Sequence, residues 1–170
     1  MYQTCLGVTV SFAGLIATSL VGFAQTADHD GPIILTIERV AFDTDMSTGL
    51  KFDLRGLEAL GVTEVATTTI WTDGVQRFEG VSLKVLADVL NVTEGGFEAW
   101  AANDYLAEIP ITDAVENGPI IAYRLNGAEM SLREKGPLWL IYPYDSDPRY
   151  RSEVIYSRSV WQLDRILVVH

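Results

Sequence analysis

The chain has 170 residues, 12 of them basic and 23 acidic, so its formal net charge is −11. Nucleic acid binding needs clustered Lys and Arg side chains against the phosphates, and an acidic surface repels anionic membranes. This composition excludes nucleic acid as an expected partner, and the length fits one domain with one sizeable core.

The N-terminal stretch has the composition of an export signal. Residues 1–27 carry no charged side chain, and residues 6–24 form an apolar run ending in Gly-Phe-Ala. We therefore expect 1–24 to be a signal peptide and 25–170 to be a single domain in the periplasm or outside the cell. No Lys or Arg precedes the run, so a retained membrane anchor is the alternative, since about 18 apolar residues can span a bilayer.

The sequence contains one cysteine, Cys5, which lies before the apolar run. Cleavage of the signal would remove it, and the remaining chain would have no membrane span and no thiol. We then expect no disulfide, no thiolate nucleophile and no sulfur ligand for a metal.

The first half of the expected domain combines strands with two helices. Alternating apolar residues predict a strand over 33–40, and leucines at helical spacing predict a short helix over 52–60. β-Branched and aromatic residues predict a strand over 67–71, which turns back into a strand over 75–80. Ser82 is then expected to cap a helix with one apolar face.

The next segment is predicted to be mainly β. Strands are expected over 97–102 and 105–110, joined by a turn at 103–104. Thr112 is expected to cap a short helical turn, and a further strand is expected over 120–125.

The C-terminal third begins with the strongest turn signal of the chain. Asn126-Gly127 predicts a tight hairpin. The apolar run over 136–143, bracketed by two prolines, predicts a short and fully buried strand. Residues 145–159 are polar and contain Pro148, so we expect a long loop there.

Histidine chemistry is close to excluded. His29 and His170 are the only histidines, and both lie near the ends of the sequence. Zinc hydrolases and Ser-His-Asp enzymes depend on histidine, and no Gly-rich phosphate loop is present. No catalytic residue and no metal ligand set is therefore predicted from these classes.

Five motifs follow one another in a specific order. They are the turn Phe78-Glu79-Gly80-Val81 into a helix, a Tyr-containing strand ending in Ile109-Pro110, the Asn126-Gly127 hairpin, the strand after Gly136-Pro137, and a final strand within residues 160–166 that contains Trp161, Leu163 and Ile166. This order resembles the molybdopterin-binding domain of the sulfite-oxidase family, from about residue 32 to the C-terminus. The resemblance implies an α+β, mostly β, fold of that type in reduced form, an oxidoreductase activity, molybdopterin as cofactor, and export.

The sequence departs from the family at the positions that hold the metal and the pterin. In catalytic members a cysteine thiolate before the aromatic-x-Gly-Val turn ligates molybdenum, and the resemblance places that position at Thr67, Thr68 or Thr69. A protonated hydroxyl cannot replace a thiolate that tunes the metal. Trp139 stands where members often have an arginine. The acidic segment 144–147 replaces a segment that helps to hold the pterin pyrophosphate in catalytic members.

The resemblance also gives candidate residues for a pocket, which are polar or aromatic: Trp71, Asp73, Asn103, Asp104, Tyr105, Arg133, Lys135, Tyr142, Tyr150 and Arg151. Each has a structural alternative. Tryptophans are most often core residues, Asp73, Asn103 and Asp104 suit turns, and Arg133 and Lys135 suit a solvated loop.

Three functions follow from these observations. We expect an exported module that has lost molybdenum–thiolate redox chemistry and binds a small molecule or an envelope protein. The first alternative is a molybdopterin-dependent oxidoreductase that holds its cofactor through the pterin alone. The second is an interaction protein that uses an exposed Tyr-rich loop. This alternative requires Tyr144, Tyr150 and Tyr156 to form a flat patch and not a concave pocket.

Overall fold

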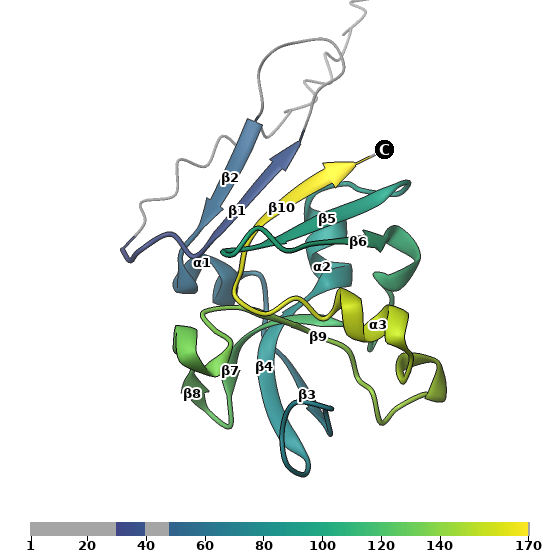
Figure 1. Ribbon diagram of the computed structural model, residues 1–170. Coiled ribbons are helices and arrows are strands. Elements are labelled where there is room, and N and C mark those ends of the chain that lie inside the picture. Colours follow the sequence, from purple (N-terminus) through teal and green to yellow (C-terminus); the bar gives the residue numbers. More distant parts are fainter. Residues whose placement is uncertain (1–29, 40–47, 170) are drawn as a thin grey trace, which may run out of the picture.

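The computed structural model describes residues 30–39 and 48–169 (Figure 1). The expected signal segment 1–24, Cys5, both histidines and the end of the first predicted strand at Val40 lie outside these residues. Within the described ranges the fold is mixed α and β, mostly β, as predicted, and it contains two sheets. No helix of the described part is long and apolar enough to cross a membrane.

The first sheet holds the two ends of the described chain together. Its strand order is β2 (Thr48–Phe52), β1 (Leu35–Arg39), β10 (Leu163–Val169), β5 (Gly96–Ala101) and β6 (Leu106–Pro110). Only β1 and β10 pair in parallel, and the other neighbours are antiparallel. The β5–β6 pair confirms the two strands predicted around 103–104.

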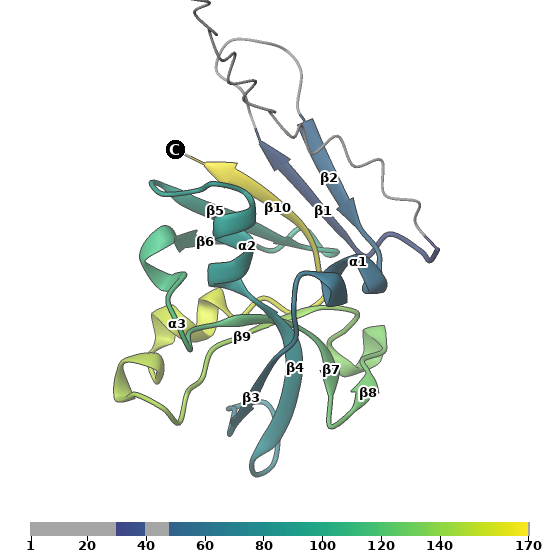
Figure 2. The same cartoon turned by 180° about the vertical axis from the view of Figure 1, so that it is seen from behind.

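The second sheet is antiparallel and lies below the first in Figures 1 and 2. Its strands are β3 (Thr63–Thr67), β4 (Gln76–Ser82), β7 (Ile120–Leu125) and β8 (Ala128–Glu129), with β9 (Trp139–Ile141) also paired to β7. The β7–β8 hairpin confirms the Asn126-Gly127 prediction, since both residues have positive φ, 52° and 81°. A type I′ turn requires this conformation at both positions.

Short helices connect the strands: α1 (Leu54–Ala59), α2 (Leu83–Val89), α3 (Glu153–Arg158), and the 3₁₀ helices η1 (Ile111–Asp113), η2 (Leu132–Glu134) and η3 (Pro148–Tyr150). The Ser82 hydroxyl accepts a hydrogen bond from the Lys84 N–H at 3.2 Å, so Ser82 caps α2 as predicted. Leu83, Leu86 and Ala87 form its buried face.

Strand β9 lies in the middle of the core. Trp139, Leu140, Ile141 and the following Tyr142 are at most 1% exposed. This confirms the buried strand predicted within 136–143, although the observed strand has three residues. It is short because Pro137 and Pro143, which have no N–H to donate, flank it, so only the central residues pair with β7.

Gly80 allows the second sheet to form next to α2. The pairing of β4 with β7 shifts register between Glu79 and Gly80, and a Cβ at residue 80 would lie 2.2 Å from the Ile121 carbonyl oxygen. No side chain fits that gap, so the glycine of the aromatic-x-Gly-Val motif is needed for packing.

Two predictions about β3 and η1 were wrong. The strand predicted over 67–71 ends at Thr67, because burial alternates through 63–67 and residues 70–74 form a turn. Thr112 does not cap η1, since that helix begins after Pro110 and has no side-chain cap.

The prediction of a long loop over 145–159 was also wrong. It contains η3 and α3, and Pro148 occupies the first turn of η3, where its missing N–H has no partner to lose. The Asp147 carboxylate accepts from the Arg149 N–H at 2.9 Å, and the Ser152 hydroxyl accepts from the Ile155 N–H at 3.4 Å. Each short helix therefore starts at its own cap.

Candidate functional site: an aromatic pocket beside a closed threonine segment

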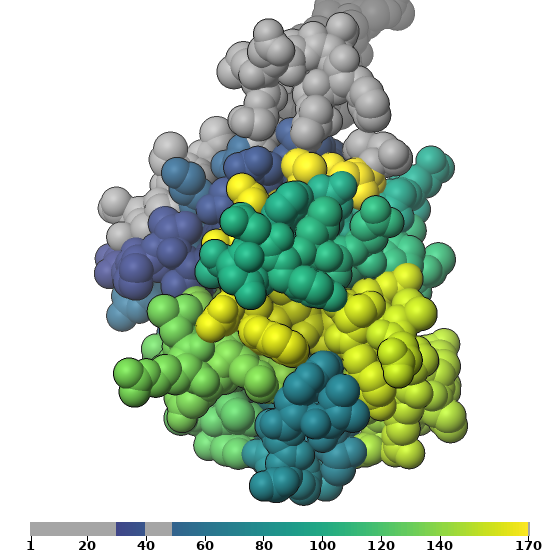
Figure 3. Space-filling view, viewed as in Figure 1, coloured from purple at the N-terminus to yellow at the C-terminus, as the bar shows by residue number. Residues whose placement is uncertain are grey.

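Three candidate residues, Trp71, Asn103 and Tyr105, line one concave site, which we call the aromatic pocket. Its volume is about 230 Å³, and its nine lining residues are Trp71, Ala101, Asn103, Tyr105, Tyr156, Ser157, Ser159, Val160 and Trp161. They come from the turn after β3, the β5–β6 turn, the end of α3 and the segment before β10. Figure 3 shows these segments, distant in sequence, meeting on one face of the molecule.

Trp71 is the centre of the aromatic contacts in this pocket. Its ring lies edge-on to those of Trp139 and Trp161, each at 5.7 Å between centroids, and to that of Tyr156 at 5.8 Å. These distances and angles are the favoured ones for aromatic pairs. Trp139 is fully buried, whereas Trp161 remains 36% exposed. Trp71 and Trp139 thus join the pocket to the core, while Trp161 lies at its surface.

Four polar side-chain atoms of the aromatic pocket already have partners within the protein. The Tyr105 hydroxyl donates to the Ser157 carbonyl at 2.7 Å, and the Asn103 side-chain oxygen accepts from the Tyr105 N–H at 3.2 Å. The Ser157 and Ser159 hydroxyls donate to main-chain carbonyls of α3 at 2.7 and 2.8 Å. What the pocket offers a ligand is therefore mainly aromatic surface.

Lys135 carries a positive charge at the edge of this cluster. Its Nζ lies 4.6 Å from the centroid of Trp161 and 5.6 Å from that of Trp139, within range of cation–π attraction. The residue has a φ of 74°, and its carbonyl accepts from the Gln162 N–H at 2.9 Å. Lys135 is thus held beside Trp161 and is not a freely solvated loop residue.

The threonine segment 67–69, where the resemblance places a metal-ligating cysteine, hydrogen-bonds to the loop after β9. The Asp145 carboxylate accepts hydrogen bonds from the Thr68 N–H at 2.6 Å and from the Thr68 hydroxyl at 2.8 Å. The Asp145 N–H in turn donates to the Thr67 hydroxyl at 3.1 Å. The Thr68 hydrogen bonds, with a further contribution from Arg151, lower the pKa of Asp145 below its usual range. The pocket begins directly after this segment, where the Trp71 N–H donates to the Thr69 hydroxyl at 3.1 Å.

These residues do not fit a molybdenum–pterin group. Threonine hydroxyls supply no soft ligand, and the described part of the chain contains no cluster of three His, Cys, Asp or Glu side chains that could hold a metal. The loop arginines, which could offset the acidic side chains beside a pyrophosphate, are already occupied. Arg151 contacts Asp145 at 2.7 Å, Arg158 contacts Asp113 at 2.9 Å, and Arg149 donates to the Tyr150 hydroxyl at 2.8 Å.

Tyr142 and Tyr150 lie in the core next to the aromatic pocket and do not line it. The Tyr142 hydroxyl donates to Asp113 at 2.7 Å, and Arg158 donates to the same carboxylate oxygen. Burial, followed by the charge of Asp113, raises the pKa of Tyr142 far above its usual value. Tyr150 packs on Tyr142 at 5.8 Å between centroids.

The Tyr-rich loop does not form a flat patch. Tyr144 and Tyr150 are buried, and burial raises the pKa of Tyr144 to about 12. Tyr156 alone of the three tyrosines lines the concave pocket. This finding favours a pocket over a flat interaction surface.

The other candidates lie outside the pocket. Asp73 is exposed in the turn before β4, and Asp104 is exposed with a φ of 64°, as expected of turn residues. Arg133 is exposed in η2, and Arg151 contacts the Tyr144 carbonyl and Asp145. These four side chains do not line the aromatic pocket.

The ten candidate residues do not include Tyr156 and Trp161, which line the pocket. Tryptophans were expected in the core, and Tyr156 was placed in a loop whose tyrosines could form either a flat patch or a concave pocket. The available signal was the Ser152-Glu153 pair, which is typical of a helix start and would have placed Tyr156 on α3.

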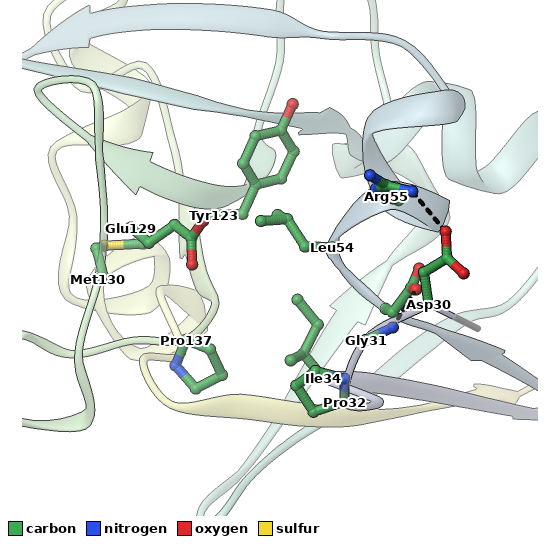
Figure 4. Close-up of a pocket in the computed structure, with 11 residues that line it drawn as sticks. Asp30, Gly31, Pro32, Ile34, Leu54, Arg55, Tyr123, Glu129, Met130 and Pro137 are labelled. Atoms are coloured by element: carbon green, nitrogen blue, oxygen red, sulfur yellow. Dashed lines mark hydrogen bonds and ion pairs between the residues drawn. The ribbon is translucent and has the colours of Figure 1, made fainter.

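A larger cleft of about 520 Å³ lies between the two sheets, and none of the ten candidate residues lines it. Figure 4 shows Met130 and Pro137 on one side and Asp30 and Arg55 on the other. Asp53 accepts from the Gly31 N–H at 3.1 Å and caps α1, which gives this acidic residue a structural role. The Tyr123 hydroxyl has no hydrogen-bond partner among the described residues, but it is directed away from Pro137 and Ile34.

Comparison with models of known protein families gives no match, and a search of curated proteins gives no significant match.

Proposed function

We propose that this chain is an exported binding module with a reduced fold of the sulfite-oxidase molybdopterin-domain type, that it has lost molybdenum–thiolate redox chemistry, and that it binds a small molecule in the aromatic pocket. The order of the five sequence motifs supports the family assignment. The mostly β, α+β architecture is consistent with it.

The Thr68–Asp145 contact is the observation that carries the loss of metal chemistry. Thr68, in the segment where the family has its cysteine, and Asp145, in the acidic loop, both depart from the family pattern. The Thr68 N–H and hydroxyl donate to the Asp145 carboxylate at 2.6 and 2.8 Å. A carboxylate that already accepts from Thr68 and Arg151 fills the place beside the expected metal position with a negative charge. A pterin pyrophosphate would be repelled by that charge.

The aromatic pocket supports the binding role. It is concave, and the exposed rings of Tyr105 and Trp161, 45% and 36% exposed, are available at its surface. Ligand sites are typically concave and lined by aromatic side chains with few polar groups. A small molecule fits this shape better than an envelope protein does, because a protein partner needs a broader contact surface.

The test is the metal and pterin content of the protein purified from a periplasm that can supply the cofactor. A catalytic family member expressed in the same cells serves as the loading control. We expect neither molybdenum nor oxidised-pterin fluorescence in this protein. Molybdenum near one atom per chain would refute the proposal and favour the alternative, an oxidoreductase that holds its cofactor through the pterin.

A further inference from the structure

We infer that the ligand of the aromatic pocket is a planar aromatic anion of one or two rings, with its acidic group bound by Lys135. This inference rests on the proposed function, because it assumes that the pocket binds a small molecule. It adds the chemical class of the ligand and the residue that selects its charge.

The size and lining of the pocket indicate a flat ligand. A volume of about 230 Å³ accommodates one or two rings with a short substituent. Four of the nine lining residues are aromatic: Trp71, Tyr105, Tyr156 and Trp161. Since the Tyr105, Ser157 and Ser159 hydroxyls and the Asn103 side-chain oxygen are hydrogen-bonded internally, we expect binding free energy to come mainly from ring contacts.

Charge at the pocket then decides between an anion and a cation. No residue that lines the pocket is charged, and the Lys135 ammonium lies 4.6 Å from the centroid of the lining residue Trp161. None of the ion pairs between described residues includes Lys135. Its charge is therefore available to an acidic group at Trp161, and it would repel a second cation there.

The backbone at Lys135 supports a role for its side chain. A φ of 74° is a left-handed conformation that disfavours a residue with a Cβ relative to glycine. The position ends η2, where glycine is the usual residue. A lysine stands at this position and places its ammonium against two indole rings.

The test uses three probes that share one ring system and differ in charge: indole-3-acetate, indole-3-acetamide and tryptamine. Binding to the full domain is measured by isothermal titration calorimetry, because three of the four tryptophans of the chain belong to the site cluster and would complicate fluorescence. We expect indole-3-acetate to bind at least about fivefold more tightly than the amide, with tryptamine weakest.

Substitutions then assign the preference to Lys135. Lys135→Met and Lys135→Gly should both abolish the preference for the acetate and leave binding of the amide within about twofold. Arg165→Met is the matched control, since Arg165 lies over Trp100 at 4.9 Å in the first sheet and should change neither probe. Ser157→Trp fills the pocket from an exposed position and should abolish binding of all three probes.

The outcomes separate this inference from the proposed function. Equal binding of acetate and amide, a preference for tryptamine, or an acetate preference that survives Lys135→Met would overturn the anion assignment and leave a ligand-binding pocket in place. Failure of all three probes to bind the wild type, or binding that Ser157→Trp leaves intact, would overturn the pocket as the ligand site and the anion assignment together.

Discussion

The carboxylate of Asp145 accepts two hydrogen bonds from Thr68, a residue 77 positions earlier in the chain. One oxygen accepts from the Thr68 N–H, and the other accepts from its hydroxyl and from Arg151. The contact ties the loop after β9 to the end of β3. Trp71, which lines the aromatic pocket, follows Thr68 by three residues.

Replacing Asp145 by Ala should lower the free energy of unfolding by about 1–2 kcal/mol, because two hydrogen bonds and a partly exposed ion pair are lost. Urea denaturation measures this difference. Asp73→Ala removes an exposed carboxylate from the neighbouring turn and should change stability by less than about 0.5 kcal/mol. Equal effects of the two substitutions would contradict a structural role for the Thr68–Asp145 contact.

The contribution of Asp145 to the free energy of unfolding should also depend on pH. Its pKa is lowered in the folded state, chiefly by the hydrogen bonds from Thr68. A lowered pKa means that the stabilisation is fully present above the unfolded carboxyl pKa of about 4 and is lost as the pH falls through the folded value. The stability difference between wild type and Asp145→Ala should thus shrink as the pH is lowered from 5 toward 3. A difference that grows over that range would show that another group is responsible.

Arg158 pairs with a mostly buried carboxylate. In the Arg158–Asp113 pair the side chains are 23% and 15% exposed, and Tyr142 also donates to Asp113. Arg158→Met would leave that charge poorly compensated and should cost about 2–3 kcal/mol in urea denaturation. Arg77→Met breaks a pair whose side chains are 64% and 56% exposed and should cost less than about 0.5 kcal/mol. A large loss from Arg77→Met alone would reverse this ranking.

Two buried tyrosines should respond oppositely to loss of the hydroxyl. The Tyr123 hydroxyl has no hydrogen-bond partner among the described residues, and burial raises its pKa. Tyr123→Phe should therefore leave stability unchanged or raise it by up to about 1 kcal/mol. Tyr142→Phe removes the donor to Asp113 and should lower stability by about 1–3 kcal/mol. Thermal and urea unfolding of both variants measure the contrast, which fails if Tyr123→Phe is the more damaging change.

Glycine is required at Gly80 for a different reason than at Gly127. A Cβ at residue 80 would lie 2.2 Å from the Ile121 oxygen, whereas a Cβ at residue 127 meets no atom within 4 Å but has a φ of 81°. Gly80→Ala should destabilise the protein by about 3 kcal/mol or more, because the β4–β7 backbones must separate. Gly127→Ala should cost only about 1 kcal/mol of backbone strain. Comparable midpoints in urea for the two variants would contradict the close packing at Gly80.

The local elements of the fold could be predicted where a residue type has one dominant conformational preference. Asn126-Gly127 predicted its hairpin, Ser82 predicted the start of α2, and the two prolines marked the limits within which β9 lies. The loop prediction based on Pro148 was wrong because the effect of proline depends on its position in a helix. Proline disrupts a helix interior but is tolerated in the first turn, where Asp147 supplies the cap.

The candidate site was only partly predictable. Trp71, Asn103 and Tyr105 were expected in a pocket and line one, while Tyr142 and Tyr150 pack in the core. Composition cannot separate these cases, because a tyrosine suits both a buried hydrogen bond and an exposed ring surface.

The sequence by itself determined the Asn126-Gly127 hairpin, the start of α2, the acidic charge and the lack of a thiol after Cys5, because these follow from local patterns and from composition. Only the tertiary structure decided that Asp145 reaches Thr68, that Lys135 lies over Trp161, and that Trp71 meets Tyr156. Each of these contacts joins segments distant in sequence. Their distances are set by how the two sheets and α3 pack together, which no local pattern encodes.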